Sequence, residues 1–281
     1  GLIILINLLF CLFARYIEFI DFNILKNKSE ILVFLFISVS FFVVGFFDDK
    51  YHLKPNLKLF AYIILIICLM LLDKDLIIKD INFTFIDLVF NLKYFNFFFT
   101  ILFFLLFINS FNMLDGINGQ AASYSFFIIL IFIFLKINLI FFIGLSIPLL
   151  FFIYFNFKEK MFLGDSGTIL LGFILSYFFI KSYNSGLKIY SDEIFLIMMI
   201  PGFELLRLAV LRIIKKKHPF SADNNHMHHL LIRKTNFVNC YLLIQFLLIF
   251  PFIFYMIVSN SILSFIISSI LYCLIIFRIS K

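Results

Sequence analysis

Residues 109–119 read N-S-F-N-M-L-D-G-I-N-G and lie between two apolar runs that are each long enough to cross a bilayer. Asn109, Asn112, Asp115 and Asn118 recur at intervals of three, so a helix would bring several of them onto one face. Carboxylate and amide groups at the end of a membrane span are costly to desolvate, and such residues mark functional sites. The stretch therefore predicts a ligand site at a membrane edge. The alternative is a polar loop with glycines that only ends a helix.

The composition places this stretch in an integral membrane protein. Hydrophobic residues make up 64% of the 281 residues and charged residues only 14%, which lies outside the range of soluble domains. The four cysteines all fall in apolar runs, at spacings typical of neither a disulfide framework nor a metal site. We expect membrane lipids, and no nucleic acid, among the partners.

Working outward from residues 109–119, the chain contains ten apolar stretches of spanning length. Lys136 and Asn138 divide the longest apolar run, which predicts a tight turn between two helices. The predicted fold class is all-α: a polytopic integral membrane helical bundle that forms a single domain over residues 1–281. The predicted spans are 1–20, 30–47, 58–72, 94–110, 120–136, 137–155, 167–181, 194–212, 240–257 and 260–277.

Polar clusters follow the second, fourth, sixth and eighth predicted spans, so all of these clusters should lie on the same side of the membrane. That side carries more lysine and arginine than the opposite loops, and the positive-inside rule assigns it to the cytoplasm. All five histidines fall on the same side. These patterns predict one active site that faces the cytoplasm. The histidines are His52, His218, His226, His228 and His229.

The cluster after the second span reads G-F-F-D-D-K-Y-H-L-K-P-N-L-K. The adjacent Asp48 and Asp49 can hold a divalent cation or act as a base, and the lysines that follow, up to Lys58, can bind phosphate oxygens. The alternative is a charged helix end whose lysines face lipid headgroups.

After the sixth span, the stretch F-L-G-D-S-G-T places Asp165 between Gly164 and Gly167. Small neighbours allow a phosphate to approach the backbone closely, and a carboxylate is a suitable ligand for Mg²⁺. The alternative is a helix start, with Asp165 or Ser166 capping the span that follows.

The longest loop contains His226, His228 and His229, followed by Arg233. A zinc site is the less favoured interpretation, because the spacing is not that of a Cys/His finger. The imidazoles are instead predicted to donate hydrogen bonds to a polyanionic substrate. In the eighth span, Glu204 and Arg207 are three residues apart and predict an intramembrane ion pair.

Four stretches of the chain, given in chain order at the end of this paragraph, resemble the signature segments of the polyprenyl-phosphate N-acetylhexosamine-1-phosphate transferases (glycosyltransferase family 4). The H-M-H-H sequence in the fourth stretch is most similar to the WecA/TagO branch of that family rather than to MraY. The resemblance implies a membrane enzyme that transfers a sugar 1-phosphate from a cytoplasmic UDP-sugar to undecaprenyl phosphate with Mg²⁺ (or Mn²⁺) and releases UMP. The four stretches are G-F-F-D-D-K-Y-H-L, N-S-F-N-M-L-D-G-I-N-G, F-L-G-D-S-G-T and P-F-S-A-D-N-N-H-M-H-H-L-L.

The resemblance also implies roles for the matched positions. Asp48 and Asp49 match the aspartates that deprotonate or position the lipid phosphate, and Lys58 matches a phosphate-binding lysine. Asn112 and Asp165 match Mg²⁺ and pyrophosphate ligands. The remaining matches are an active-site carboxylate at Asp115, a uracil contact at Asn118, and substrate contacts at Asn109, His226, His228, His229 and Arg233.

Differences from the family pattern bear on these expectations. The WecA/TagO branch usually has Asp at the position of Asn118 and more often Asp at the position of Glu204. The family also begins with a further helix, so we expect eleven spans in the full-length protein. UDP-GlcNAc is the expected donor for a cell-surface polysaccharide in a bacterial inner membrane, with another UDP-HexNAc or UDP-MurNAc-pentapeptide as alternatives. The oligomeric state is left open, a homodimer included. The alternative class is a secondary transporter, which predicts internal duplication that the sequence lacks.

Overall fold

The structure is a computed structural model that describes residues 1–281 apart from 20–21, 26, 188, 218–224 and 281. The chain forms two compact units. Unit 1 comprises Gly1–Asp80 and Asn91–Lys188, and unit 2 comprises Ile81–Phe90 and Ile189–Lys281.

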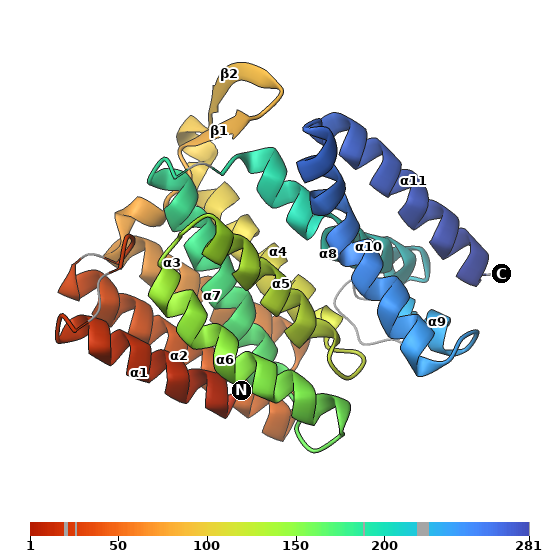
Figure 1. The fold of residues 1–281 in the computed structure, drawn as a ribbon, viewed down its shortest axis with the longest axis horizontal. Helices are drawn as coiled ribbons and strands as arrows, with labels where there is room; N and C mark the ends of the chain where they lie inside the picture. The colour runs from red at the N-terminus through yellow and green to blue at the C-terminus, as the bar shows by residue number, and fades with distance from the viewer. Residues whose placement is uncertain (20–21, 26, 188, 218–224, 281) are drawn as a thin grey trace. The chain divides into compact units, whose positions relative to one another are not determined.

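Unit 1 is a bundle built around one central helix, α7. Its helices are α1 (Leu2–Tyr16), α2 (Lys28–Tyr51), α3 (Pro55–Leu72), α4 (Asn96–Leu114), α5 (Gln120–Phe134), α6 (Leu139–Phe157) and α7 (Gly164–Asn184) (Figure 1). Helix α7 is buried along almost its whole length and packs most extensively against α2 and α4. Aromatic rings fill these contacts: Phe34 lies 4.4 Å from Tyr177, and Phe41 lies 4.7 Å from Phe173, between ring centroids.

Helices α2 and α7 approach each other at backbone distance. A Cβ added at Gly45 would lie 2.5 Å from the Cα of Ser166, so any larger residue would force the helices apart. This approach brings the end of α2 against the start of α7.

The other end of α7 is fixed by an ionic group, which we call the Lys181 cluster; its Lys181 and Asp73 side chains are buried, whereas that of Asp75 is exposed. The ammonium of Lys181 lies 2.9 Å from both carboxylate oxygens of Asp73, and the hydroxyl of Tyr177 donates to the same carboxylate at 3.3 Å. Glu30 and Asp75 each lie 3.8 Å from the ammonium. The cluster ties α7 to the start of α2 and to the short 3-10 helix Lys74–Leu76 that follows α3.

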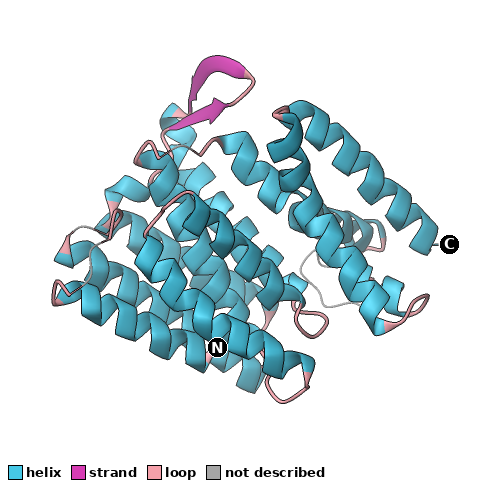
Figure 2. Ribbon diagram, viewed as in Figure 1, coloured by secondary structure: helices cyan, strands magenta, loops and turns pink. Residues whose placement is uncertain are grey.

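Unit 2 comprises helices α8 (Ser191–Ile214), α9 (Met227–Ile232), α10 (Phe237–Val258) and α11 (Ser261–Ser280). It also includes the hairpin residues Ile81–Phe90, from strands β1 (Asp80–Phe83) and β2 (Ile86–Asn91) (Figure 2). The carboxylate of Asp192, at the start of α8, accepts hydrogen bonds from the backbone N–H of Thr84, at 3.1 Å, and from its hydroxyl. These bonds attach the hairpin to α8.

The all-α membrane fold is confirmed. In the described part of the chain, eight helices are long and apolar enough to cross a membrane, namely α2, α3, α4, α6, α7, α8, α10 and α11. The predicted spans 1–20 and 120–136 correspond to the shorter apolar helices α1 and α5. The predicted turn is also present, because Lys136 and Asn138 both have positive φ between α5 and α6.

The structure differs from the predicted elements in several places, among them the start of α3, the hairpin, and the short helix α9 within the longest predicted loop. Helix α3 begins at Pro55 rather than near residue 58, since proline is favoured in the first turn of a helix. The hairpin was not predicted, because its short apolar run could not be distinguished from the start of the following span.

Candidate active site

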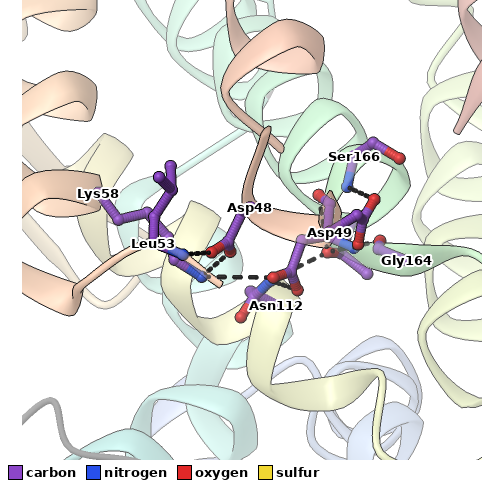
Figure 3. A network of polar contacts seen from close by, with 9 residues as sticks. Asp48, Asp49, Leu53, Lys58, Asn112, Gly164 and Ser166 are labelled. Atoms are coloured by element: carbon purple, nitrogen blue, oxygen red, sulfur yellow. Dashed lines mark hydrogen bonds and ion pairs between the residues drawn. The ribbon is translucent and has the colours of Figure 1, made fainter. Parts of the chain in front are cut away.

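Four side chains from α2, α3, α4 and α7 meet at the start of α7 and form what we call the Lys58 cluster: Asp48, Lys58, Asn112 and Asp165. The first three are labelled in Figure 3. The ammonium of Lys58 forms an ion pair with Asp48 and lies 3.4 Å from Oδ2 of Asp165. Oδ1 of Asp48 accepts a hydrogen bond from the backbone N–H of Leu53 at 3.0 Å, which folds the link between α2 and α3 back onto the carboxylate.

Asn112 holds the other side of Asp165. Its amide nitrogen donates to Oδ1 of Asp165 at 2.6 Å and to the hydroxyl of Thr168 at 3.2 Å. Thr168 lies one turn further along α7, and the sequence analysis did not assign it. The Asp165 carboxylate is therefore oriented from both sides, by an amide and by an ammonium.

Asp49 caps α7 from a neighbouring helix. Its carboxylate oxygens accept hydrogen bonds from the backbone N–H groups of Asp165 at 2.7 Å and Ser166 at 3.1 Å. Gly164 permits this contact, since its φ is +66° and an added Cβ would lie 2.8 Å from the Asp49 carboxylate. Helix α7 thus begins at Gly164, and Asp165 and Ser166 lie in its first turn instead of capping it.

Only the first part of residues 109–118, which carry the regularly spaced polar groups, is helical. Helix α4 ends at Leu114, Asp115 is its C-cap, and Asn118 lies in the turn before α5. The amide nitrogen of Asn109 donates to the carbonyl of Leu105 in its own helix at 2.7 Å. Asn112 is therefore the asparagine of this stretch that the structure joins to Asp165.

Asp115 lies in an environment that opposes its ionisation. Burial raises the pKa of Asp115 to about 7, and the negative charges of Asp165 and Asp49 act in the same direction. This carboxyl group can therefore exchange a proton near neutral pH.

Asn156 links two loops of the site, and the sequence analysis did not identify it as a site residue. Its side-chain oxygen accepts a hydrogen bond from the backbone N–H of Gly119, and its nitrogen donates to the carbonyl of Met161 at 2.5 Å. This buried asparagine thus fixes the 115–119 turn relative to the loop that leads into α7. A polar residue near the end of an apolar helix was the one available signal.

The three histidines lie in unit 2, at the start of α9. Their ring centroids are 4.2 Å (His228–His229), 5.3 Å (His226–His228) and 6.0 Å (His226–His229) apart. Burial, with His229 and His226 nearby, lowers the pKa of His228 to about 3, so this imidazole is neutral at pH 7 and retains one N–H donor. Arg233 is the C-cap of α9.

Part of the histidine motif cannot be placed. Residues 218–224, which include His218 and the stretch P-F-S-A-D-N, lie outside the described residues.

The Lys58 cluster has a donor set that suits a hard cation bound together with a ligand. Among the described residues, no three or more His, Cys, Asp or Glu side chains are grouped as a metal site. Mg²⁺, however, is typically held by one or two carboxylates, with substrate phosphates and water completing its shell. The Asp48 and Asp165 carboxylates converge on a single ammonium, and the residues present therefore fit Mg²⁺ bound with a phosphate compound.

These features define a polytopic helical membrane protein with a carboxylate–lysine site at the ends of its spans. The family model described as "Glycosyl transferase family 4" matches residues 31–183, and the chain belongs to this family. The match includes every residue of the Lys58 cluster.

Similar proteins carry related names. The chain is 28% identical over 205 residues to the undecaprenyl-phosphate alpha-N-acetylglucosaminyl 1-phosphate transferase of Thermotoga maritima, covering 72% of this chain and 62% of that protein. It is 28% identical over 203 residues to the "probable undecaprenyl-phosphate N-acetylglucosaminyl 1-phosphate transferase" of Bacillus subtilis, covering 68% and 55%. The Salmonella typhi transferase is 26% identical over 202 residues, with the same coverage. The chain thus spans little more than half the length of these relatives.

Proposed function

We propose that this chain transfers N-acetylhexosamine 1-phosphate from a UDP-sugar to undecaprenyl phosphate and releases UMP, with UDP-GlcNAc as the donor. The product would be the first lipid-linked intermediate of a cell-surface polysaccharide. The observation that carries the proposal is the Lys58 cluster. One ammonium and two carboxylates meet there, where α2 ends and α3 and α7 begin, and Asn112 joins them from the end of α4. The names of the relatives support both the sugar phosphate and the lipid acceptor.

The chemistry of this reaction requires a site of this kind. An oxygen of the lipid phosphate attacks the phosphorus that bears the sugar, the bond from that phosphorus to the UMP oxygen breaks, and UMP leaves with the bonding electron pair. Both reactants are anions, so much of the barrier comes from their repulsion and from the charge that develops on UMP. Cations held at this point lower that barrier.

The acidic and basic residues of the site in unit 1 have the following proposed roles. Lys58 binds the lipid phosphate, and Asp48 beside it positions that phosphate or accepts its proton. Asp49 holds the start of α7 through two backbone N–H groups and thereby positions Asp165. We favour direct attack by the lipid phosphate over a covalent aspartyl intermediate.

Asp165 and Asn112 are the residues proposed to hold Mg²⁺, which would neutralise phosphate charge when bound. Asp115 adds a carboxyl group that titrates near neutral pH. Asn109 and Asn118 are proposed substrate contacts, Asn118 on the nucleotide base, and His226, His228, His229 and Arg233 are proposed to contact the donor phosphates. The site is proposed to face the cytoplasm in a bacterial inner membrane, which would leave the prenyl tail in lipid.

The test is UMP release and lipid-linked sugar formation in detergent, with undecaprenyl phosphate, Mg²⁺ and a panel of UDP-HexNAc donors. We expect product with UDP-GlcNAc and none with the Asp48→Asn variant. Turnover with UDP-MurNAc-pentapeptide alone would reassign the donor. Absence of product with every donor, from protein that also carries any preceding native residues, would reject the proposal and favour transport.

A further inference from the structure

The carboxylate of Glu204, buried in the membrane helix α8, accepts four hydrogen bonds. Its ion-pair partner Arg207 donates twice, from Nη2 to Oε1 at 2.6 Å and from Nε to Oε2 at 2.9 Å. The backbone N–H of Met227 donates to Oε1 at 2.6 Å, and the hydroxyl of Tyr272 donates to Oε2 at 2.9 Å. The predicted ion pair is therefore present, but it is one part of a larger arrangement that joins α8, α9 and α11.

One of these contacts, together with a further hydrogen bond from Arg207, fixes the chain on either side of His226. Met227 is the first residue of α9, so the Glu204 carboxylate caps the helix that carries His228 and His229. Arg207 also donates from Nη2 to the carbonyl of Asn225 at 2.7 Å. The backbone is thus held directly before and directly after the first histidine.

Other contacts hold α9 in the same orientation. The thiol of Cys240 in α10 donates to the carbonyl of His228 at 3.7 Å. The Tyr272 ring packs against Phe203 at 5.7 Å between centroids, which aims its hydroxyl at Glu204. Three membrane helices therefore hold a helix of only six residues, which would be unstable alone.

A simple intramembrane ion pair would not require this arrangement. Two charges three residues apart satisfy one another within a single helix, whereas the Glu204 carboxylate also binds a backbone N–H 23 residues away and a phenol 68 residues away. Hydrogen bonds to an ionised group are stronger than neutral ones. The Glu204 carboxylate can therefore hold the start of α9 in place as well as balance the charge of Arg207.

We infer that Glu204 is a positioning residue, which orients the three histidines by holding the start of α9 against α8 and α11. What the histidines bind rests on the proposed function, whereas the positioning itself does not. A neutral amide at this position would accept fewer of the four bonds and would leave Arg207 without its countercharge.

The experiment compares two glutamates of the same helix. Glu193, at the other end of α8, accepts from the Tyr255 hydroxyl at 2.9 Å and from the Tyr190 N–H at 2.7 Å, and it does not bind α9. Glu193→Gln is therefore the matched control for Glu204→Gln. Hydrogen exchange of the 225–232 amides is measured in each purified protein, together with KM for UDP-GlcNAc and for undecaprenyl phosphate.

We expect Glu204→Gln to accelerate exchange in α9 about tenfold and to raise KM for the donor about tenfold, with KM for the lipid changed less than about twofold. Tyr272→Phe, which removes one bond and no charge, should produce a smaller change of the same kind and replaces Glu204→Gln if that variant does not fold. Exchange in α9 equal to that of the Glu193→Gln control would overturn the inference, as would an equal rise of both KM values. Absence of turnover in the wild-type protein would instead count against the proposed function, and exchange alone would then decide the positioning.

Discussion

The two ends of α7 carry clusters of the same chemistry with different exposure. In the Lys181 cluster, the side chains of Lys181 and Asp73 are 7% and 4% exposed, and the ammonium contacts both carboxylate oxygens. In the Lys58 cluster, the side chains of Lys58 and Asp165 are 19% and 35% exposed, and the ammonium is shared between two carboxylates. The first cluster is closed by its own partners, whereas the second leaves its Asp165 carboxylate accessible. The exposure of one carboxylate, Asp165, rather than residue type, separates the candidate active site from the structural ion cluster.

Removing the carboxylate at the start of α7 is expected to have the largest effect. Asp165→Asn should lower turnover about a thousandfold, because the proposed Mg²⁺ ligand is lost and, with it, the cation that would stabilise the charge of the transition state, while the fold changes little. The measurement is UMP release at saturating Mg²⁺, with thermal unfolding as the control. Undiminished turnover would remove Asp165 from the reaction.

The Lys181 cluster should respond in the opposite way. Lys181→Met leaves Asp73 buried beside two further acidic groups, so we expect a loss of about 3–5 kcal/mol in stability. Turnover per folded molecule should stay within about twofold of the wild type. Thermal unfolding and turnover in detergent are measured on the same sample, and unchanged stability would contradict the structural role of this cluster.

A third variant tests which substrate contacts the turn between α4 and α5, next to the Lys58 cluster. Asn118→Ala should raise KM for the UDP-sugar about tenfold, because the hydrogen bonds proposed between Asn118 and the base would be lost. The KM for undecaprenyl phosphate should change little. An equal change in both constants would argue against a nucleotide contact.

The smallest expected effect is the pH dependence of stability that Asp115 contributes near Asp165. Its pKa is raised to about 7 in the folded protein, so the unfolded chain releases this proton at lower pH than the folded protein does. Stability should therefore fall as pH rises from about 4 to about 7, by about 1 kcal/mol because solvent reaches part of the side chain. Asp115→Asn should reduce this slope in substrate-free protein, and an unchanged slope would assign it to other groups.

The sequence predicts the spans well, since long apolar runs require helices in a bilayer. It also predicts Asp48, Lys58, Asn112 and Asp165 as site residues, because charged and amide groups are costly at the ends of spans, and the structure brings these four side chains together. The capping of α7 by Asp49 could not be predicted, because the two segments are 116 residues apart and the bond depends on how α2 packs against α7.

The Lys181 cluster shows the same limit. Lys181 is the last residue of the predicted span 167–181, whereas the structure places it within α7 and buries it against Asp73. Asn156 and the four-bond role of Glu204 likewise depend on tertiary contacts. Local sequence shows that a polar group is unusual at its position but does not show which partner satisfies it.

The backbone contact at Gly45 limits the routes open to a long-chain lipid. At Gly45, beside the Lys58 cluster, the space between α2 and α7 is too narrow for even a methyl group. A lipid whose phosphate rests on Lys58 cannot pass its isoprenoid chain through that gap. If the proposed acceptor binds at Lys58, its isoprenoid chain would have to leave the bundle between other helices, and the close contact of α2 with α7 would lie behind its headgroup.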